Sequence, residues 1–173
     1  MKTKNSGKEK TRKGEKFVAF FLIAGGLLGV IAAVPMGLHF AKEGQTWRAC
    51  TQIIAAGLFL FCIATGSALW RDLLGALRSS QILFALQVPA FSLARFSYEF
   101  SALFSIRLMI GETAHNIGGN IGSSLNLNLS PQPVGFMFGV NIVAAIVFLY
   151  LIRTSLSGLV HKFSDKSREV AHV

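Results

Sequence analysis

The longest apolar run of this chain is the feature that most restricts its fold. Residues Phe17 to Ala41 contain no Asp, Glu, Lys or Arg. At about 1.5 Å per residue, a helix of this run exceeds the roughly 30 Å hydrocarbon core of a bilayer. A cleaved signal peptide also follows a basic segment, but its apolar region is shorter and closes on a small-residue cleavage site. We therefore interpret the run as a retained membrane span.

Three further apolar segments follow the first, and they differ in strength. The second ends at Trp70, a residue typical of a membrane interface, and the fourth contains the single amide Asn141. The third is the weakest, because it is short, contains Gln87 and Pro89 and ends at Arg95. The pattern predicts an α-helical membrane protein with four transmembrane helices. Their approximate bounds are 17–41, 53–70, 79–96 and 134–153.

Composition and charge support lipid as the solvent. Hydrophobic residues make up 52% of the 173 residues and charged residues 14%, against about a quarter in soluble domains. The net charge is +9, and seven of the 17 Lys and Arg residues lie within residues 1–16. A basic tail on a hydrophobic body indicates anionic lipid rather than nucleic acid as the partner. Residues 1–16 have too little apolar surface to offset the entropy lost on ordering, so they are predicted to be disordered.

The distribution of charge predicts the topology. With four spans, thirteen Lys and Arg residues lie on the side of the N-terminal tail and four on the other. By the positive-inside rule, residues 1–16 and the basic tail 154–173 are cytoplasmic. A three-span alternative would export the basic C-terminal segment and weaken this asymmetry. We expect a multi-pass protein of the bacterial inner membrane, with residues 97–130 on the exported side.

Two segments of this exported region alternate in polarity. In residues 98–110 the even positions are all apolar or aromatic and the odd positions are mostly polar, whereas in 117–129 the even positions are all small or polar. A period of two indicates strands with one apolar face. The segments therefore predict an exported amphipathic β-hairpin over 97–130. The alternative is that 98–110 continues the third helix and that 117–133 is a loop.

The hairpin register follows from matching the apolar faces. Pairing Ile110 with Ile117 aligns Phe100 with Leu127 and puts most apolar side chains on one face. A slip by one residue would place the two apolar sets on opposite faces. An open hairpin cannot lie in the hydrocarbon core, because its edges would lack hydrogen bonds. We therefore expect the hairpin to rest on the helix ends, with its polar face outward.

Two groups of polar residues are the candidates for contacts. The partner-facing candidates on the polar face of the hairpin are Glu99, Arg107, Asn120, Asn126 and Asn128. Polar residues within spans are functional candidates by default, and here they are the amides Gln87 and Asn141. We expect these amides to hydrogen-bond neighbouring helices.

Sequence motifs of enzymes are not found. No P-loop, HExxH, GxSxG or dinucleotide fingerprint occurs, and the four His residues are widely separated. Cys50 and Cys62 on one helix would lie about 18 Å apart, too far for a disulfide. The sequence therefore predicts no catalytic residue, no cofactor and no metal site.

The resulting interpretation is a non-enzymatic membrane protein of unknown activity. It would act as an interaction or accessory protein that presents its exported hairpin. The expected partners are the lipid bilayer and either a second copy or another membrane or periplasmic protein, with no nucleic acid. The alternative is a small oligomeric transporter or channel, which solute flux dependent on Gln87 or Asn141 would indicate.

Overall fold

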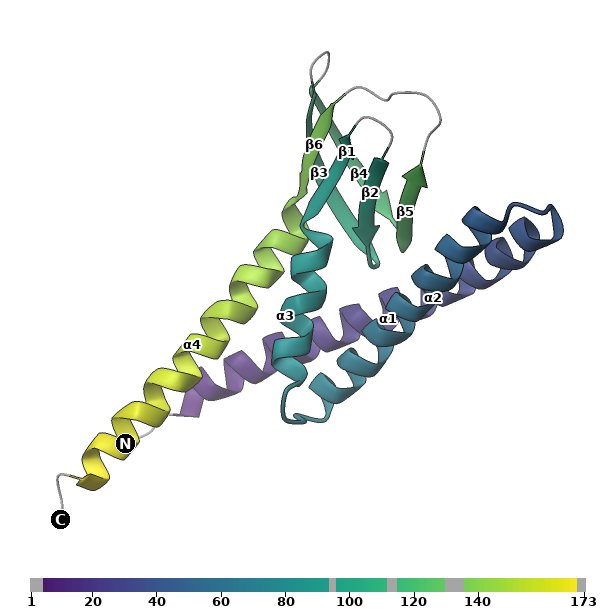
Figure 1. Ribbon diagram of the computed structural model, residues 1–173. Coiled ribbons are helices and arrows are strands. Elements are labelled where there is room, and N and C mark those ends of the chain that lie inside the picture. The colour runs from purple at the N-terminus through teal and green to yellow at the C-terminus, as the bar shows by residue number, and fades with distance from the viewer. Residues whose placement is uncertain (1–4, 94–95, 112–114, 130–135, 171–173) are drawn as a thin grey trace.

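A computed structural model describes the backbone of residues 5–93, 96–111, 115–129 and 136–170, together with most of their side chains. The helices are α1 (Asn5–Lys42), α2 (Thr46–Trp70), α3 (Ala76–Gln87) and α4 (Ile142–Val170). The strands are β1 (Pro89–Leu93), β2 (Phe96–Ser101), β3 (Phe104–Gly111), β4 (His115–Ile121), β5 (Ser124–Leu129) and β6 (Met137–Asn141). α1 and α2 lie antiparallel, α3 and α4 pack together across them, and the sheet stands against the α1–α2 pair (Figure 1).

Close packing of α1 on α2 depends on glycines that face the partner helix. A Cβ on Gly26 would lie 2.7 Å from the carbonyl oxygen of Phe59, and one on Gly66 would lie 2.8 Å from that of Ala19. Gly29 lies against the Phe59 ring. Because these glycines have no Cβ, the two backbones approach each other closely, as in many membrane helix pairs.

The first two predicted spans lie within helices that begin earlier than expected. The segments Lys13–Lys42 and Thr46–Trp70 are both long and apolar enough to cross a membrane. The predicted disorder is wrong from Asn5 onward, because α1 begins there, and residues 1–4 lie outside the described part. Lys, Glu and Arg are good helix formers, so a helix that forms in the apolar run extends into the charged tail. In the same way, α4 continues into the predicted C-terminal tail as far as Val170.

The predicted third span is wrong beyond Gln87. α3 ends there, and β1 begins at Pro89. Proline has no N–H to donate and disfavours helical backbone at the residue before it, which explains the break. The apolar residues of the expected helix belong instead to a strand.

The predicted fourth span is helical only from Ile142. Its earlier residues Met137–Asn141 form β6. The side chain of Asn141 accepts a hydrogen bond from the Ala144 N–H at 3.3 Å and so caps the start of α4. The apolar part of α4 is the shorter segment Ile142–Ser157. Four transmembrane helices are therefore not confirmed.

The predicted hairpin is part of a larger sheet. The six strands form one antiparallel sheet in the order β4–β3–β6–β1–β2–β5. β2 and β3 are successive halves of the first predicted strand, and β4 and β5 are successive halves of the second. β1 and β6, which come from the third and fourth predicted spans, lie between β2 and β3.

The observed register differs from the predicted one by two residues. Ile110 pairs with His115 rather than Ile117, and Phe100 pairs with Leu125 rather than Leu127. A shift of two residues leaves every side chain on its predicted face, because the side-chain period of a strand is two. The predicted division into an apolar and a polar face is therefore retained, although the partners change.

Both strands of the predicted hairpin bend between their two halves, and the bend contacts α1. Leu103 and Gly122 both have positive φ, 67° and 131°, and the Gly122 N–H donates to the Leu103 carbonyl. The Ser123 hydroxyl accepts from the Leu103 N–H and donates to the carbonyl of Gly25, where an added Cβ would lie 2.9 Å from the Leu103 nitrogen. Gly25 lies within the long apolar segment of α1, so the expectation that the hairpin rests on the helix ends is wrong.

We predict that Gly26→Ala destabilises the α1–α2 pair, because the new Cβ would meet the Phe59 carbonyl oxygen, which cannot rotate away. Overpacking of this kind costs about 1–3 kcal/mol. Gly57→Ala is the matched control in α2, since its Cβ position has no atom within 4 Å, and alanine is the better helix former by about 1 kcal/mol. Thermal unfolding in mild detergent should show a lower Tm for Gly26→Ala alone. Equal values for both variants would contradict the packing.

Candidate functional site: the polar face of the sheet

One face of the sheet carries mostly small or polar side chains, and Met109 and Met137 are the large apolar exceptions. Residues directly opposite each other in an antiparallel pair point to the same face, so the register assigns each side chain to a face. The polar face carries Ala90, Ser92, Ser97, Glu99, Ser101, Ser105, Arg107, Met109, Gly118, Asn120, Ser124, Asn126, Met137, Gly139 and Asn141. The predicted partner-facing residues are thus gathered from four strands onto one surface.

An ion pair between Glu99 and Arg107 crosses the inside of this surface. The two residues belong to β2 and β3, which are separated in the sheet by β1 and β6. Three strand spacings of about 4.8 Å would hold them about 14 Å apart in a flat sheet, so their contact requires the sheet to curl with its polar face inward. The side chains are 21% and 22% exposed, respectively. The expectation that this pair looks outward is therefore wrong.

The amides Gln87 and Asn141 are both buried, with exposures of 1% and 2%. Gln87 Oε1 accepts a hydrogen bond from the Ala102 N–H at 3.2 Å and ties the end of α3 to the bend. Asn141 caps α4 through the Ala144 N–H. Both amides therefore hydrogen-bond backbone donors at element ends, whereas contacts between neighbouring helices were expected.

The three predicted asparagines have different surroundings. Asn120 is half-buried and lies opposite Ser105 on the polar face. Asn126 is exposed on the edge strand β5, opposite Glu99. Asn128 has a register position opposite Ser97, and its side chain lies outside the described part. Of the three, only Asn126 is seen to be available to a partner.

Two residues of the polar interior were missed in the sequence. The hydroxyls of Ser92 and Ser105 are buried and have no hydrogen-bond partner in the described part of the chain. The same is true of two nitrogen atoms, Gln87 Nε2 and Arg107 Nε. Ser105 occupies a polar position of the alternating segment 98–110. The sequence does not show that this polar face points into the curl, so the burial of Ser105 could not be predicted. Ser92 lies in the segment interpreted as helix, where the alternation of Phe91, Ser92 and Leu93 was the available signal.

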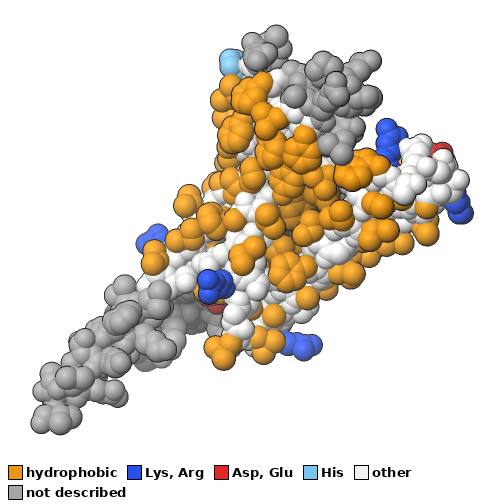
Figure 2. Space-filling model, viewed as in Figure 1, with side chains coloured by type: hydrophobic (Ala, Val, Ile, Leu, Met, Phe, Trp, Pro, Cys, Tyr) orange, Lys and Arg blue, Asp and Glu red, His pale blue; other side chains and the backbone are white. Residues whose placement is uncertain are grey.

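The opposite face of the sheet is apolar and points outward. Near α2 it is buried, with Phe100 at 1% exposure and its ring centroid 5.7 Å from that of Phe59. Farther from the helices it is open. The exposed members include Ile106, Leu108, Ile110, Ile117, Ile121 and Phe138. Figure 2 shows apolar side chains continuing from the helices over the sheet.

The contacts of this site include the ion pair between Glu99 and Arg107 and the hydrogen bonds of Gln87 and Asn141 to backbone N–H groups. Among the described residues, no three His, Cys, Asp or Glu side chains gather into a possible metal site. The observed contacts hold the curl closed and fix the ends of α3 and α4. Comparison with protein-family models, curated protein sequences and solved structures found no match. Only the geometry of this chain therefore bears on its function.

We predict that Glu99→Gln destabilises the protein, because it leaves the half-buried guanidinium of Arg107 without its carboxylate. The pair is about a fifth exposed, so the cost should lie between about 1 kcal/mol, as for a surface ion pair, and about 3–5 kcal/mol, as for a fully buried one. The double variant Glu99→Gln with Arg107→Met should recover most of this loss, since it also removes the unpaired charge. Asn126→Ala is the control on the exposed part of the same face. A single-variant cost below about 1 kcal/mol in denaturant unfolding would mean that the pair is solvated.

Proposed function

We propose that this chain is a multi-pass protein of the bacterial inner membrane that acts without catalysis, as an interaction or accessory protein. The observation that carries the proposal is the sidedness of the sheet. Charged and polar side chains point into the curl, while large apolar side chains such as Ile117 point outward. Water disfavours that arrangement, and large apolar patches mark contacts with lipid or with another protein. Lipid or an apolar protein surface would cover the outer face of this sheet.

The depth of the sheet along α1 supports immersion in the membrane. Gly25, which receives the bend, lies about 12 Å along the helix from Phe17, where the apolar run begins. In a bilayer that position is near the centre of the hydrocarbon core. Non-helical backbone at such depth must be covered and hydrogen-bonded by protein. The Leu103 N–H bonds Ser123, and the Ala102 N–H bonds Gln87.

Contacts at one end of the helices support the proposed orientation. Lys16 Nζ lies 5.8 Å from the centre of the Trp70 ring, and Gly14 packs against the Tyr150 hydroxyl. The start of the apolar segment of α1, the end of α2 and the middle of α4 therefore lie together (Figure 1). Both basic tails then leave from the same side, which we assign to the cytoplasm from the excess of Lys and Arg there.

The proposed interaction surface is the outer face of β3 and β4 together with the free edge of β4. Ile117 and Ile121 on β4 are 73% and 86% exposed. β4 ends the sheet, so its outer backbone groups have no neighbouring strand within the described chain. Strand edges of this kind pair with another chain or must be covered. A second copy or another membrane protein would satisfy both the edge and the apolar side chains.

A small oligomeric transporter or channel is the alternative. Its polar pathway would need Gln87 or Asn141, yet both amides are engaged with backbone N–H groups of the same chain. Their geometry favours a structural role. The interaction role therefore has the stronger support.

We predict that a cysteine at Leu108, on the outer face, reacts slowly with an impermeant thiol reagent applied to intact spheroplasts. Lipid or a partner would cover that position. Glu43→Cys, in the exposed turn between α1 and α2, is the control and should react quickly. The background for both is Cys50→Ser with Cys62→Ala.

Denaturation in dodecyl sulfate should bring both positions to the same rate. Equal rates before denaturation would contradict a covered outer face. Slow reaction at both positions would contradict the proposed orientation, because the turn would then lie on the cytoplasmic side.

A further inference from the structure

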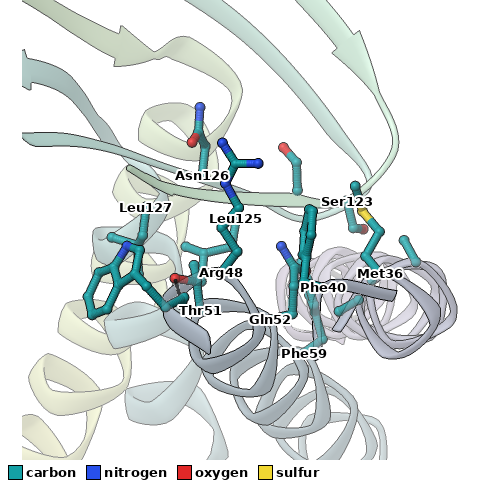
Figure 3. A pocket seen from close by; sticks show the side chains of 15 residues that line it. Met36, Phe40, Arg48, Thr51, Gln52, Phe59, Ser123, Leu125, Asn126 and Leu127 are labelled. Atoms are coloured by element: carbon teal, nitrogen blue, oxygen red, sulfur yellow. Dashed lines mark hydrogen bonds between the residues drawn. The ribbon is translucent and has the colours of Figure 1, made fainter. Parts of the chain in front are cut away.

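A groove of about 350 Å³ lies between the α1–α2 pair and the edge strand β5 (Figure 3). Its size falls within the range of pockets that bind small molecules, about 300–1,000 Å³. One wall is formed by residues 29–40 of α1, one by residues 47–59 of α2 and the third by residues 123–127. The buried amides Gln87 and Asn141 do not line it.

The deep end of the groove is apolar and narrow. Gly29, Ala32 and Ala33 line it from α1, and small side chains there leave room beside the ring of Phe59. Leu125 closes it from the sheet. From Arg48 to Phe59 the groove follows α2 for about 16 Å, which is about half the thickness of the hydrocarbon core.

The outer end of the groove carries a cation and two amides. Arg48 and Gln52 extend from α2 toward β5, where Asn126 is exposed (Figure 3). The Arg48 guanidinium donates to Gln45 Oε1 at 2.8 Å and lies 5.7 Å from the centre of the Phe40 ring. Among the described residues no ion pair includes that guanidinium, and the carboxylate of Glu43 accepts instead from Gln45 Nε2 at 2.7 Å. Its charge is therefore available to an anionic ligand.

We propose that this groove binds an anionic phospholipid, with one acyl chain along α1 and α2 and its phosphate at Arg48. The inference rests on the proposed membrane location. In that location Arg48 lies near the exported end of the helix pair, beside Trp47, at the depth of the lipid headgroups. The apolar end then opens at the depth of the acyl chains, so both ends of the groove match the parts of one lipid molecule.

Charge and shape together favour a lipid over a second copy or a peptide strand. Only four of the 17 Lys and Arg residues lie on the predicted exported side, and Arg48 is the one placed at this groove. The groove also runs lengthwise along the helices, as a lipid chain does in a bilayer.

The test uses Trp47, which lines the groove, as the reporter of the bound lipid. Trp70→Phe removes the other tryptophan. The protein is placed in nanodiscs of phosphatidylglycerol and phosphatidylcholine in equal amounts, with brominated acyl chains on one lipid at a time. Bromine on phosphatidylglycerol should quench Trp47 more strongly than bromine on phosphatidylcholine. One cation near a membrane surface changes such a preference about fivefold, so Arg48→Gln should reduce it by about that factor.

Two matched controls separate the groove from the general surface. Arg71→Gln removes an exposed cation at the other end of α2 and should leave the preference unchanged. Ala32→Phe fills the groove and should abolish the preference, whereas Ala41→Phe, exposed on α1 outside the groove, should not.

Each other outcome overturns the inference in a distinguishable way. Equal quenching by both lipids would mean that the protein is inserted but the groove does not select, which leaves the proposed function standing. Quenching by neither lipid would contradict the membrane location itself. A preference that survives Ala32→Phe would place the lipid outside the groove. Self-association lost in Ala32→Phe, without any lipid preference, would assign the groove to a second copy.

Discussion

The curl of the sheet around its polar face is the constraint on which its sidedness depends. The ion pair between Glu99 and Arg107 joins β2 to β3 across two intervening strands, so it can form only when the sheet is curled in this way. Once both charges are inside, the alternation of each strand directs the apolar side chains outward. The exposed apolar surface of β3 and β4 therefore follows from the direction of the curl. A soluble domain of this size would bury the apolar face instead.

A second constraint connects the sheet to the helices. The absence of a side chain at Gly25 lets the bend at Leu103 reach the backbone of α1, and Ser123 bonds the Gly25 carbonyl there. This contact holds β5 beside α2 and leaves the groove between them. The packing of the helix pair at Gly26 and Gly29 fixes the floor of the same groove. The proposed lipid site thus depends on the glycines that allow the fold.

The sequence predicted local features better than long-range ones. The period of two assigned Glu99 and Arg107 to the same face as Asn120, and the register kept that assignment. Periodicity cannot tell which face points inward, because that depends on the surrounding medium and on strands from elsewhere in the chain. Those strands, β1 and β6, were interpreted as parts of membrane helices. Phe91 and Phe138 are as apolar as residues of a membrane helix, and Pro89 was the signal that a helix ends there.

The groove between α1, α2 and β5 could not be predicted from the sequence, for a related reason. It is built from three segments that are distant in sequence, and none of them has an unusual pattern by itself. Arg48 and Asn126 were visible as polar residues, but their approach depends on the bend at Gly122. Such non-local arrangements follow from tertiary packing, which local propensity and periodicity do not determine.

The most direct test of the account is a cross-link between positions 99 and 107. In a simple hairpin these positions lie on one extended strand, about 26 Å apart, beyond the reach of a short bifunctional thiol reagent. In the curled sheet their side chains meet, so Glu99→Cys with Arg107→Cys, in the background without Cys50 and Cys62, should cross-link in native membranes. Tyr98→Cys with Ile106→Cys has the same spacing on the outer face and should not. Failure of the first pair, or equal cross-linking of both pairs, would contradict a sheet that closes around its polar face.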